Sequence, residues 1–258
     1  MRAVVDGLDM GYTDEGQGLP LFFVHGFPFH RGIWQKQVDA LRASYRVIAP
    51  DLRGFGETEG RPGPVTMSQF AGDLKALLKR LAPGPVVMVG HSMGGYVALA
   101  FALQFPEMLR GLVLVATRSG KDSPEGAEAR RELAGKVKVQ GSRVVVDAMA
   151  GKMLAPGNRD PRMVEEMRSV MSSAKPQGVI GALLGMAERP DVTPMLKKIP
   201  VPTLVVTGAQ DALIPPSESE AMAQAIRGTQ LSLIPDAGHL VAFEQPEAFH
   251  GLLRKWLE

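Results

Sequence analysis

Val86-Val87-Met88-Val89-Gly90-His91-Ser92-Met93-Gly94-Gly95-Tyr96 is the stretch of sequence that decides the fold. Four apolar residues run directly into Gly-His-Ser-Met-Gly-Gly, and a helical pattern follows through Ala102. This pattern predicts a buried strand, an abrupt turn and the start of a helix. A serine at such a turn is held in a strained backbone conformation, and Gly90 and Gly94 supply the room around it. We therefore expect Ser92 to project above the carboxyl end of the strand as a nucleophile.

A glycine-rich turn of this kind can also bind phosphate or simply reverse the chain. No Lys-Ser or Lys-Thr follows these glycines, so the turn is not a P-loop, and it lacks the Gly-x-Gly-x-x-Gly of a dinucleotide site. The strand before the serine and the helix after it are the context that a catalytic serine requires. The nucleophile interpretation is therefore favoured.

The composition excludes several classes of protein. Of 258 residues, 45% are hydrophobic and 22% charged, which is typical of a globular protein with a sizeable core. The formal net charge of +2 comes without a basic run, so nucleic acid is not expected as a partner. No apolar stretch approaches the roughly 20 residues needed to cross a bilayer, and the early charges do not resemble a secretory signal. Cysteine is absent, which excludes disulfides and thiolate catalysis. A cytoplasmic protein without membrane contact is the resulting expectation.

Strands and helices alternate along most of the chain. Buried strands are predicted over 19–24, 45–49, 86–89, 112–116, 203–206 and 231–234, with helices over 33–43, 66–81, 218–226 and at the C-terminus. This alternation predicts an α/β fold with a mostly parallel central sheet flanked by helices. Between 118 and 198 only helical segments are predicted, over 125–139, 144–154, 161–173 and 178–187. We therefore divide the chain into a core (1–117 and 199–258) and an inserted helical cap (118–198), which should lie near the serine.

A serine hydroxyl needs a base to take its proton, and histidine is the usual base. Of the five histidines, His239 follows the last predicted strand and should lie at the same sheet edge as Ser92. His25 is expected to brace its loop, and His91 to point away from the serine. His30 and His250 are expected at the surface.

The base must be oriented by an acid, and Asp211 follows the strand over 203–206 at that same edge. Asp236 is a rival but lies too close to His239 in sequence to reach the far ring nitrogen easily. Asp51 is a second rival, in a loop whose composition indicates internal hydrogen bonding. We favour Asp211, because the order Ser, Asp, His is the one expected for this architecture.

Acyl transfer also needs donors for the developing oxyanion. The backbone N–H of Met93, directly after the nucleophile, is one candidate. The His25-Gly26-Phe27 turn offers the second, from the backbone N–H of Phe27.

Five motifs together carry a family resemblance. They are His25-Gly26-Phe27, Asp51-Leu52-Arg53-Gly54-Phe55-Gly56, Gly90-His91-Ser92-Met93-Gly94-Gly95, Gly208-Ala209-Gln210-Asp211 and Gly238-His239. With them the chain resembles the α/β-hydrolase superfamily, and most of all its small bacterial carboxylesterases and 3-oxoadipate enol-lactonases. The resemblance implies a serine hydrolase without metal or organic cofactor, acting on a small-molecule ester through Ser92, His239 and Asp211.

The cap suggests which ester fits. Seven of the 14 methionines lie within it, and methionine adapts to varied apolar groups. We expect the substrate to contact Met149, Met153 and Met186 of the cap and Phe29 of the oxyanion loop. Short helices close over the serine favour short-chain esters, with acyl chains of about two to six carbons.

Two other functions stay open. An enol-lactonase, or a related lactonase or perhydrolase, shares the same machinery. Its carboxylate-bearing substrate would need a cation in the pocket, which Arg31 or Arg118 could supply. A ligand receptor with the hydrolase fold is the alternative outside enzymes. The sequence leaves the oligomeric state open.

Overall fold

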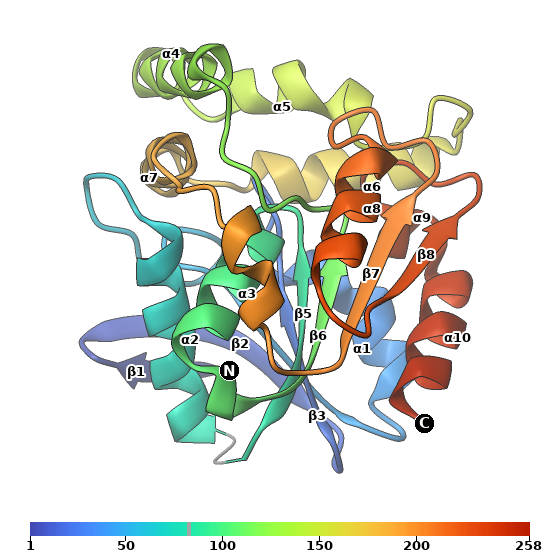
Figure 1. Ribbon diagram of the computed structural model, residues 1–258. Coiled ribbons are helices and arrows are strands. Elements are labelled where there is room, and N and C mark those ends of the chain that lie inside the picture. The colour runs from blue at the N-terminus through green and yellow to red at the C-terminus, as the bar shows by residue number, and fades with distance from the viewer. Residues whose placement is uncertain (82–83) are drawn as a thin grey trace.

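Eight strands form the central sheet of the computed structural model, which describes residues 1–81 and 84–258 (Figure 1). The strands are β1 (Arg2–Val5), β2 (Leu8–Glu15), β3 (Pro20–Val24), β4 (Arg46–Pro50), β5 (Val86–His91), β6 (Leu109–Val115), β7 (Thr203–Gly208) and β8 (Gln230–Ile234). Their spatial order is β1-β2-β4-β3-β5-β6-β7-β8. Strand β2 runs antiparallel to both its neighbours, and the strands from β4 to β8 pair in parallel. The predicted α/β fold with a mostly parallel sheet is confirmed.

Helices cover both faces of this sheet because the inner strands are apolar on both sides. Along β5, Val86 and Met88 belong to one core cluster, and Val87 and Val89 belong to the other. The first cluster is shared with α2 (Met67–Leu81), α3 (Met93–Gln104) and α8 (Pro216–Ala225). The second is shared with α1 (Gln35–Leu41) and α10 (Pro246–Leu257). The alternation of side chains along a strand thus builds two cores from one sheet.

The inserted helices lie above one edge of the sheet. Figure 1 shows α4 (Pro124–Gln140), α5 (Arg143–Met149), α6 (Pro161–Ser172) and α7 (Pro176–Ala187) stacked over the carboxyl ends of the parallel strands. Short elements complete the chain: η1 (Arg31–Trp34), η2 (Pro106–Met108), η3 (Ala150–Lys152), η4 (Thr193–Lys198) and α9 (Val241–Glu244). Ligands of open α/β sheets bind at the carboxyl edge of the strands. In this protein the helices α4 to α7 cover that edge.

Proline and glycine account for differences from the predicted helix bounds. Helix α7 begins at Pro176, two residues earlier than predicted, because proline is well suited to the first turn of a helix. The helix predicted over 144–154 ends as α5 at Met149 and continues only as the 3-10 turn η3, which contains Gly151. The helix predicted over 33–43 likewise divides into η1 and α1.

Helix α7 is in backbone contact with the loop that joins β4 to α2. A side chain at Gly178 would overlap the backbone of Gly54, and one at Gly185 would overlap that of Val65. The backbone N–H of Val65 donates to the carbonyl of Gly181 across the same contact, at 2.9 Å. Glycine at these positions lets the helix and the loop approach more closely than any other residue would allow.

Candidate active site

Ser92 lies at the turn between β5 and α3, in a backbone conformation that few residues adopt. Its φ and ψ are 52° and −116°, a strained combination for a residue with a side chain. A Cβ at Gly90 would come within 2.5 Å of the carbonyl oxygen of Gly94, so the turn requires glycine there. The first turn of α3 is thereby pressed against the end of β5, and the serine hydroxyl is left to face the site.

The structure brings Ser92, His239 and Asp211 together from three loops at one sheet edge. Ser92 Oγ lies 2.8 Å from His239 Nε2, and His239 Nδ1 lies 2.8 Å from Asp211 Oδ2. Parallel pairing explains the meeting, because β5, β7 and β8 all end at this edge and Ser92, Asp211 and His239 follow these ends. The three side chains form a continuous hydrogen-bond chain, the arrangement that a serine nucleophile requires.

Asp211 is held in its charged form. Burial opposes ionisation, since the residue is only 6% exposed, but the hydrogen bond from His239 lowers the pKa of Asp211 below its ordinary value. The backbone N–H groups of Leu213 and Ile214 donate to its Oδ1 at 2.8 and 2.9 Å and act in the same direction. An ionised Asp211 accepts the Nδ1–H of His239, which leaves Nε2 as the acceptor facing the serine hydroxyl.

The two rival acids lie elsewhere. Asp51 forms an ion pair with Arg31 and accepts the backbone N–H of Glu57 at 2.8 Å. Asp236 is exposed, and its carboxylate accepts from Gln210 at 3.3 Å. Arg31 also pairs with Glu57 at 2.9 Å, so the structure does not bring it to the pocket around Ser92.

The other histidines have structural contacts. His25 donates from Nδ1 to the carbonyl of Gly26 and accepts the N–H of Leu52 at Nε2, both at 2.9 Å, and burial lowers its pKa to about 4. His30 caps η1 by accepting the N–H of Gly32. The expectation that His250 lies at the surface was wrong: it is 2% exposed.

His91 contacts the backbone of the candidate base, a contact that the sequence did not reveal. Its Nε2 lies 2.9 Å from the carbonyl oxygen of His239, and the two ring centroids are 5.0 Å apart. Burial lowers the pKa of His91 to about 3, so the ring is neutral and donates from Nε2.

Glu244 is a second residue that sequence reasoning missed. Its carboxylate accepts the N–H of Gly238 at 2.6 Å and the N–H of Ala155 at 2.8 Å. It thereby joins the residue before His239 to the chain following η3. A single acid in the otherwise apolar run Leu240-Val241-Ala242-Phe243-Glu244 was the available signal, because a buried carboxylate must find donors.

The loop around Gly26 lies directly against the serine. A Cβ at Gly26 would stand 2.6 Å from His91 Nδ1 and 3.0 Å from Ser92 Cβ, so only glycine fits. Phe27 lines the pocket beside Ser92, and Met93 is the first residue of α3, where a backbone N–H has no partner within the helix. Both candidate oxyanion donors therefore belong to backbone that adjoins the serine.

The pocket at Ser92 has a volume of about 100 Å³. Its lining includes Phe27, Tyr96, Arg118, Arg130, Met149, Met186, Leu213, Ile214 and His239. Of the substrate contacts predicted from sequence, the structure brings Met149 and Met186 to this pocket but neither Phe29 nor Met153. Phe29 packs in the core with its ring centroid 6.5 Å from that of His91, and Met153 is fully buried there as well.

Three arginines surround the buried carboxylate of Asp122 beside the pocket. Arg118 and Arg130 both bond to Asp122, the latter from Nε at 2.5 Å, and Arg189 Nη1 lies 3.2 Å from Asp122 Oδ1. Burial works against ionisation, but the hydrogen bond from Arg130 and the three positive charges hold the pKa of Asp122 below its usual value. The cluster carries an excess of positive charge, because one carboxylate faces three guanidinium groups.

Neither a cluster of side chains that could hold a metal ion nor a helix able to span a membrane occurs within residues 1–81 and 84–258. No group of three or more His, Asp or Glu side chains in this part of the chain is arranged to hold a metal ion. No helix there is long and apolar enough to cross a membrane.

Comparison with known proteins agrees with the fold. Residues 20–246 match the family model of the alpha/beta hydrolase fold. The chain is 43% identical to a thermophilic esterase from Thermogutta terrifontis, solved with malate bound, covering 100% of this chain and 97% of the other with a TM-score of 0.96. It is 28% identical over 232 residues to 3-oxoadipate enol-lactonase 2 of Acinetobacter baylyi, covering 89% of this chain and 85% of the relative. It is 31% identical over 251 residues to non-heme chloroperoxidase CPO-A1 of Kitasatospora aureofaciens, covering 92% of this chain and 90% of the relative. The chain belongs to the α/β-hydrolase fold family.

Proposed function

We propose that this hydrolase is a serine carboxylesterase for short-chain esters. Two hydrogen bonds of 2.8 Å, from Ser92 Oγ to His239 Nε2 and from His239 Nδ1 to Asp211 Oδ2, are the observation that carries the proposal. In this mechanism Ser92 Oγ attacks the ester carbonyl while His239 takes its proton and passes it to the leaving alcohol. Water then attacks the acyl-enzyme by the same route, and the acid is released.

Backbone donors stabilise the tetrahedral oxyanion in this proposal. The N–H groups of Phe27 and Met93 would each contribute roughly 3–4 kcal/mol to transition-state stabilisation. The loop of Gly26 presses against Ser92, which supports a donor position at Phe27. Because the donors are backbone groups, the side chains of these two residues affect pocket shape rather than charge.

The size of the pocket supports a short acyl chain. A volume of about 100 Å³ leaves space for a few heavy atoms. Met149 of α5 and Met186 of α7 contribute to its lining, and both helices lie above the sheet edge in Figure 1. We propose that residues 118–198 act as a cap that closes the substrate site. The similarity to the Thermogutta esterase supports the same chemistry.

A turnover assay with p-nitrophenyl acetate tests the proposal and separates an esterase from a ligand receptor. Wild-type protein should hydrolyse the ester and should gain the mass of one organophosphate at Ser92. Ser92→Ala should abolish both turnover and labelling, while Ser173→Ala, at an exposed serine after α6, should change neither. A label on another residue, or wild-type protein without turnover, would contradict the assignment.

An enol-lactonase is the second candidate, favoured by the guanidinium groups of Arg118 and Arg130 in the pocket lining. The enol-lactonase of Acinetobacter is the relative that supports it. Both arginines are already paired with Asp122, which reduces their attraction for a substrate carboxylate. We therefore expect kcat/KM for neutral short-chain esters to exceed that for a carboxylate-bearing lactone at least tenfold. The reverse preference, lost in Arg118→Met, would favour the lactonase.

A further inference from the structure

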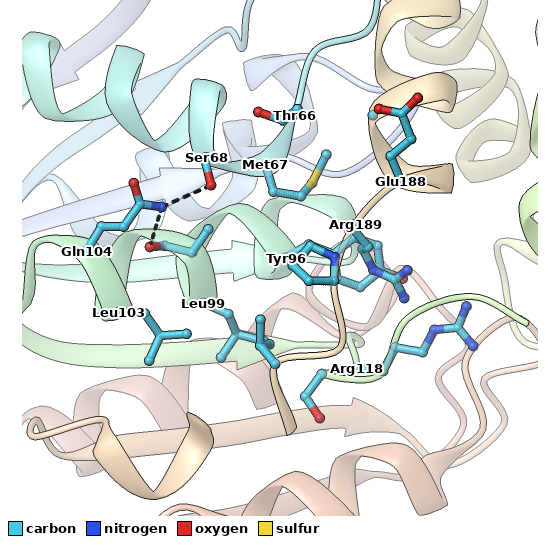
Figure 2. A pocket seen from close by; sticks show the side chains of 15 residues that line it. Thr66, Met67, Ser68, Tyr96, Leu99, Leu103, Gln104, Arg118, Glu188 and Arg189 are labelled. Atoms are coloured by element: carbon cyan, nitrogen blue, oxygen red, sulfur yellow. Dashed lines mark hydrogen bonds between the residues drawn. The ribbon is translucent and has the colours of Figure 1, made fainter. Parts of the chain in front are cut away.

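A second cavity lies behind the wall of the candidate active site. It has a volume of about 320 Å³ and is lined by residues of α2, α3 and the end of α7 (Figure 2). Tyr96 and Arg118 line both this cavity and the pocket at Ser92, so these two side chains form the wall between them. The second cavity is thus separate from the proposed reaction site but adjoins it.

The second cavity is mainly apolar at one end, where Gln104 and Ser68 are polar lining residues, and cationic at the other. Figure 2 shows Leu99 and Leu103 on one side of Tyr96 and the guanidinium groups of Arg118 and Arg189 on the opposite side. Val192 adds a further apolar contact to the lining. A cavity with this polarity matches an amphipathic molecule with an anionic head and an unbranched apolar tail.

Arg189 has unused capacity for an anion. The residue is only 6% exposed, its guanidinium carbon lies 4.1 Å above the ring of Tyr96, and its Nη2 donates to the carbonyl of Gly120 at 2.5 Å. Its Nη1 and the Nε of Arg118 are both buried, and neither makes a hydrogen bond to the residues that the structure describes, although Asp122 Oδ1 lies 3.2 Å from Arg189 Nη1. Burial lowers the pKa of Arg189, because nearby anions do not fully compensate its charge. A carboxylate is the group that best matches such donors.

The acidic residues beside the cavity do not balance the charge of its arginines. Asp122 shares its two oxygens among three arginines. Glu188 also lines the cavity, but it is exposed, and Figure 2 shows its carboxylate pointing away from the two guanidinium groups. An entering anion would therefore meet net positive charge.

We propose that the second cavity binds linear monocarboxylates of medium chain length. At the roughly 30 Å³ that one water molecule occupies in the liquid, the cavity holds about ten heavy atoms, which is the size of octanoate. An acid of this length is larger than the acyl group that the pocket at Ser92 would accept, so the second cavity would take a ligand other than the reaction product. Binding at this cavity therefore needs no turnover at Ser92.

Calorimetric titration of the intact protein with octanoate tests the site, with octanol as the matched neutral probe. Octanoate should bind at least tenfold more tightly than octanol, because only the acid pairs with the guanidinium group of Arg189. Ala100→Leu should weaken octanoate binding at least tenfold by filling the cavity, and leucine preserves helix α3 at this partly exposed position. Arg189→Met should remove the preference for octanoate over octanol. Arg131→Met, at an exposed arginine of α4, is the control that should change nothing.

Three results would overturn the site. They are an absence of octanoate binding, equal affinity for octanol in the wild type, and unchanged affinity in Ala100→Leu, which would place the acid in the pocket at Ser92 instead. If Arg189→Met does not fold, Ala100→Leu still decides. If the wild-type protein binds octanoate but hydrolyses no ester, only the proposed function is contradicted.

Discussion

The Nε2 of His91 lies 2.9 Å from the carbonyl oxygen of His239. The residue directly before the candidate nucleophile therefore holds the backbone of the candidate base. This contact spans 148 positions of sequence and joins the end of β5 to the loop after β8. We therefore expect the distance between Ser92 and the imidazole of His239 to depend on the side chain of His91.

Replacement of His91 should therefore lower kcat more than it raises KM. In His91→Phe the carbonyl of His239 loses its donor, and a displacement of about 1 Å at a reacting group can cost roughly 100-fold in rate. His91→Gln offers an amide donor and should recover part of kcat. Steady-state kinetics on p-nitrophenyl acetate measure both parameters, and equal kcat in the two variants would exclude a role for this hydrogen bond.

Asp211→Asn should lower kcat by several orders of magnitude and leave the fold intact. The asparagine cannot hold the Nδ1–H tautomer of His239, so Nε2 would no longer accept the proton of Ser92. Asp236→Asn, at the exposed rival position, should retain wild-type kcat. Circular dichroism checks folding, and a loss of activity in Asp236→Asn alone would reassign the acid.

Stability should fall in mild acid because two buried histidines resist protonation. Burial lowers the pKa of His25 to about 4 and that of His91 to about 3, whereas an unfolded histidine titrates near 6.5. Between these values the unfolded chain binds more protons than the folded chain, so the free energy of unfolding decreases as pH falls from about 6.5 to about 4. At about 1.4 kcal/mol per unit of pKa difference, the total loss is on the order of several kcal/mol.

Urea unfolding at pH 7 and pH 4.5 measures this loss. The decrease in unfolding free energy should be smaller in His91→Gln than in the wild type, since one buried histidine is gone. Titration of carboxylates is common to both proteins and cancels in the comparison. An equal decrease in both would exclude His91 as a source of the acid sensitivity.

Glu244→Gln should destabilise the protein by about 1–3 kcal/mol and reduce activity. An amide has one acceptor oxygen, so it cannot accept from both Gly238 and Ala155, and one of these buried N–H groups loses its partner. Glu247→Gln, at an exposed acid of α10, is the matched control and should stay within about 0.5 kcal/mol of the wild type. Thermal unfolding and p-nitrophenyl acetate kinetics on both variants measure the two effects. Similar stability and similar activity in Glu244→Gln and Glu247→Gln would show that the hydrogen bonds of Glu244 contribute to neither.

The sequence was most informative where local pattern and topology coincide. Parallel strands place their carboxyl ends together, so a motif after each strand sufficed to group Ser92, Asp211 and His239. Contacts that depend on the direction of a side chain could not be predicted from the sequence. Phe29 follows the oxyanion loop closely, yet its ring turns into the core instead of the pocket. His250 is polar but lies between Phe249 and Leu253 on the buried face of α10.

Ion pairs between residues that are distant in sequence were equally impossible to predict. Asp122, Arg130 and Arg189 meet only because α4 and the end of α7 lie side by side, and no periodicity in the sequence relates them. The sequence offers Arg118 as a cation for the pocket, but no pattern in it predicts the ion pair of Arg118 with Asp122. The second cavity depends on this cluster and therefore emerged only from the structure.

Helix α7 meets the backbone of the loop between β4 and α2 at Gly178 and Gly185, and its buried side chains, such as Leu183, pack in the same core cluster. Helix α7 could move away from this loop as a rigid body only if the hydrogen bond from the N–H of Val65 to the carbonyl of Gly181 were broken. We therefore expect substrate and product to pass by rotamer changes of lining side chains such as Met149 and Met186, rather than by motion of whole helices. For the proposed esterase, the range of accepted esters would then be widened by replacing single side chains of the pocket lining, with the helices of residues 118–198 left in place.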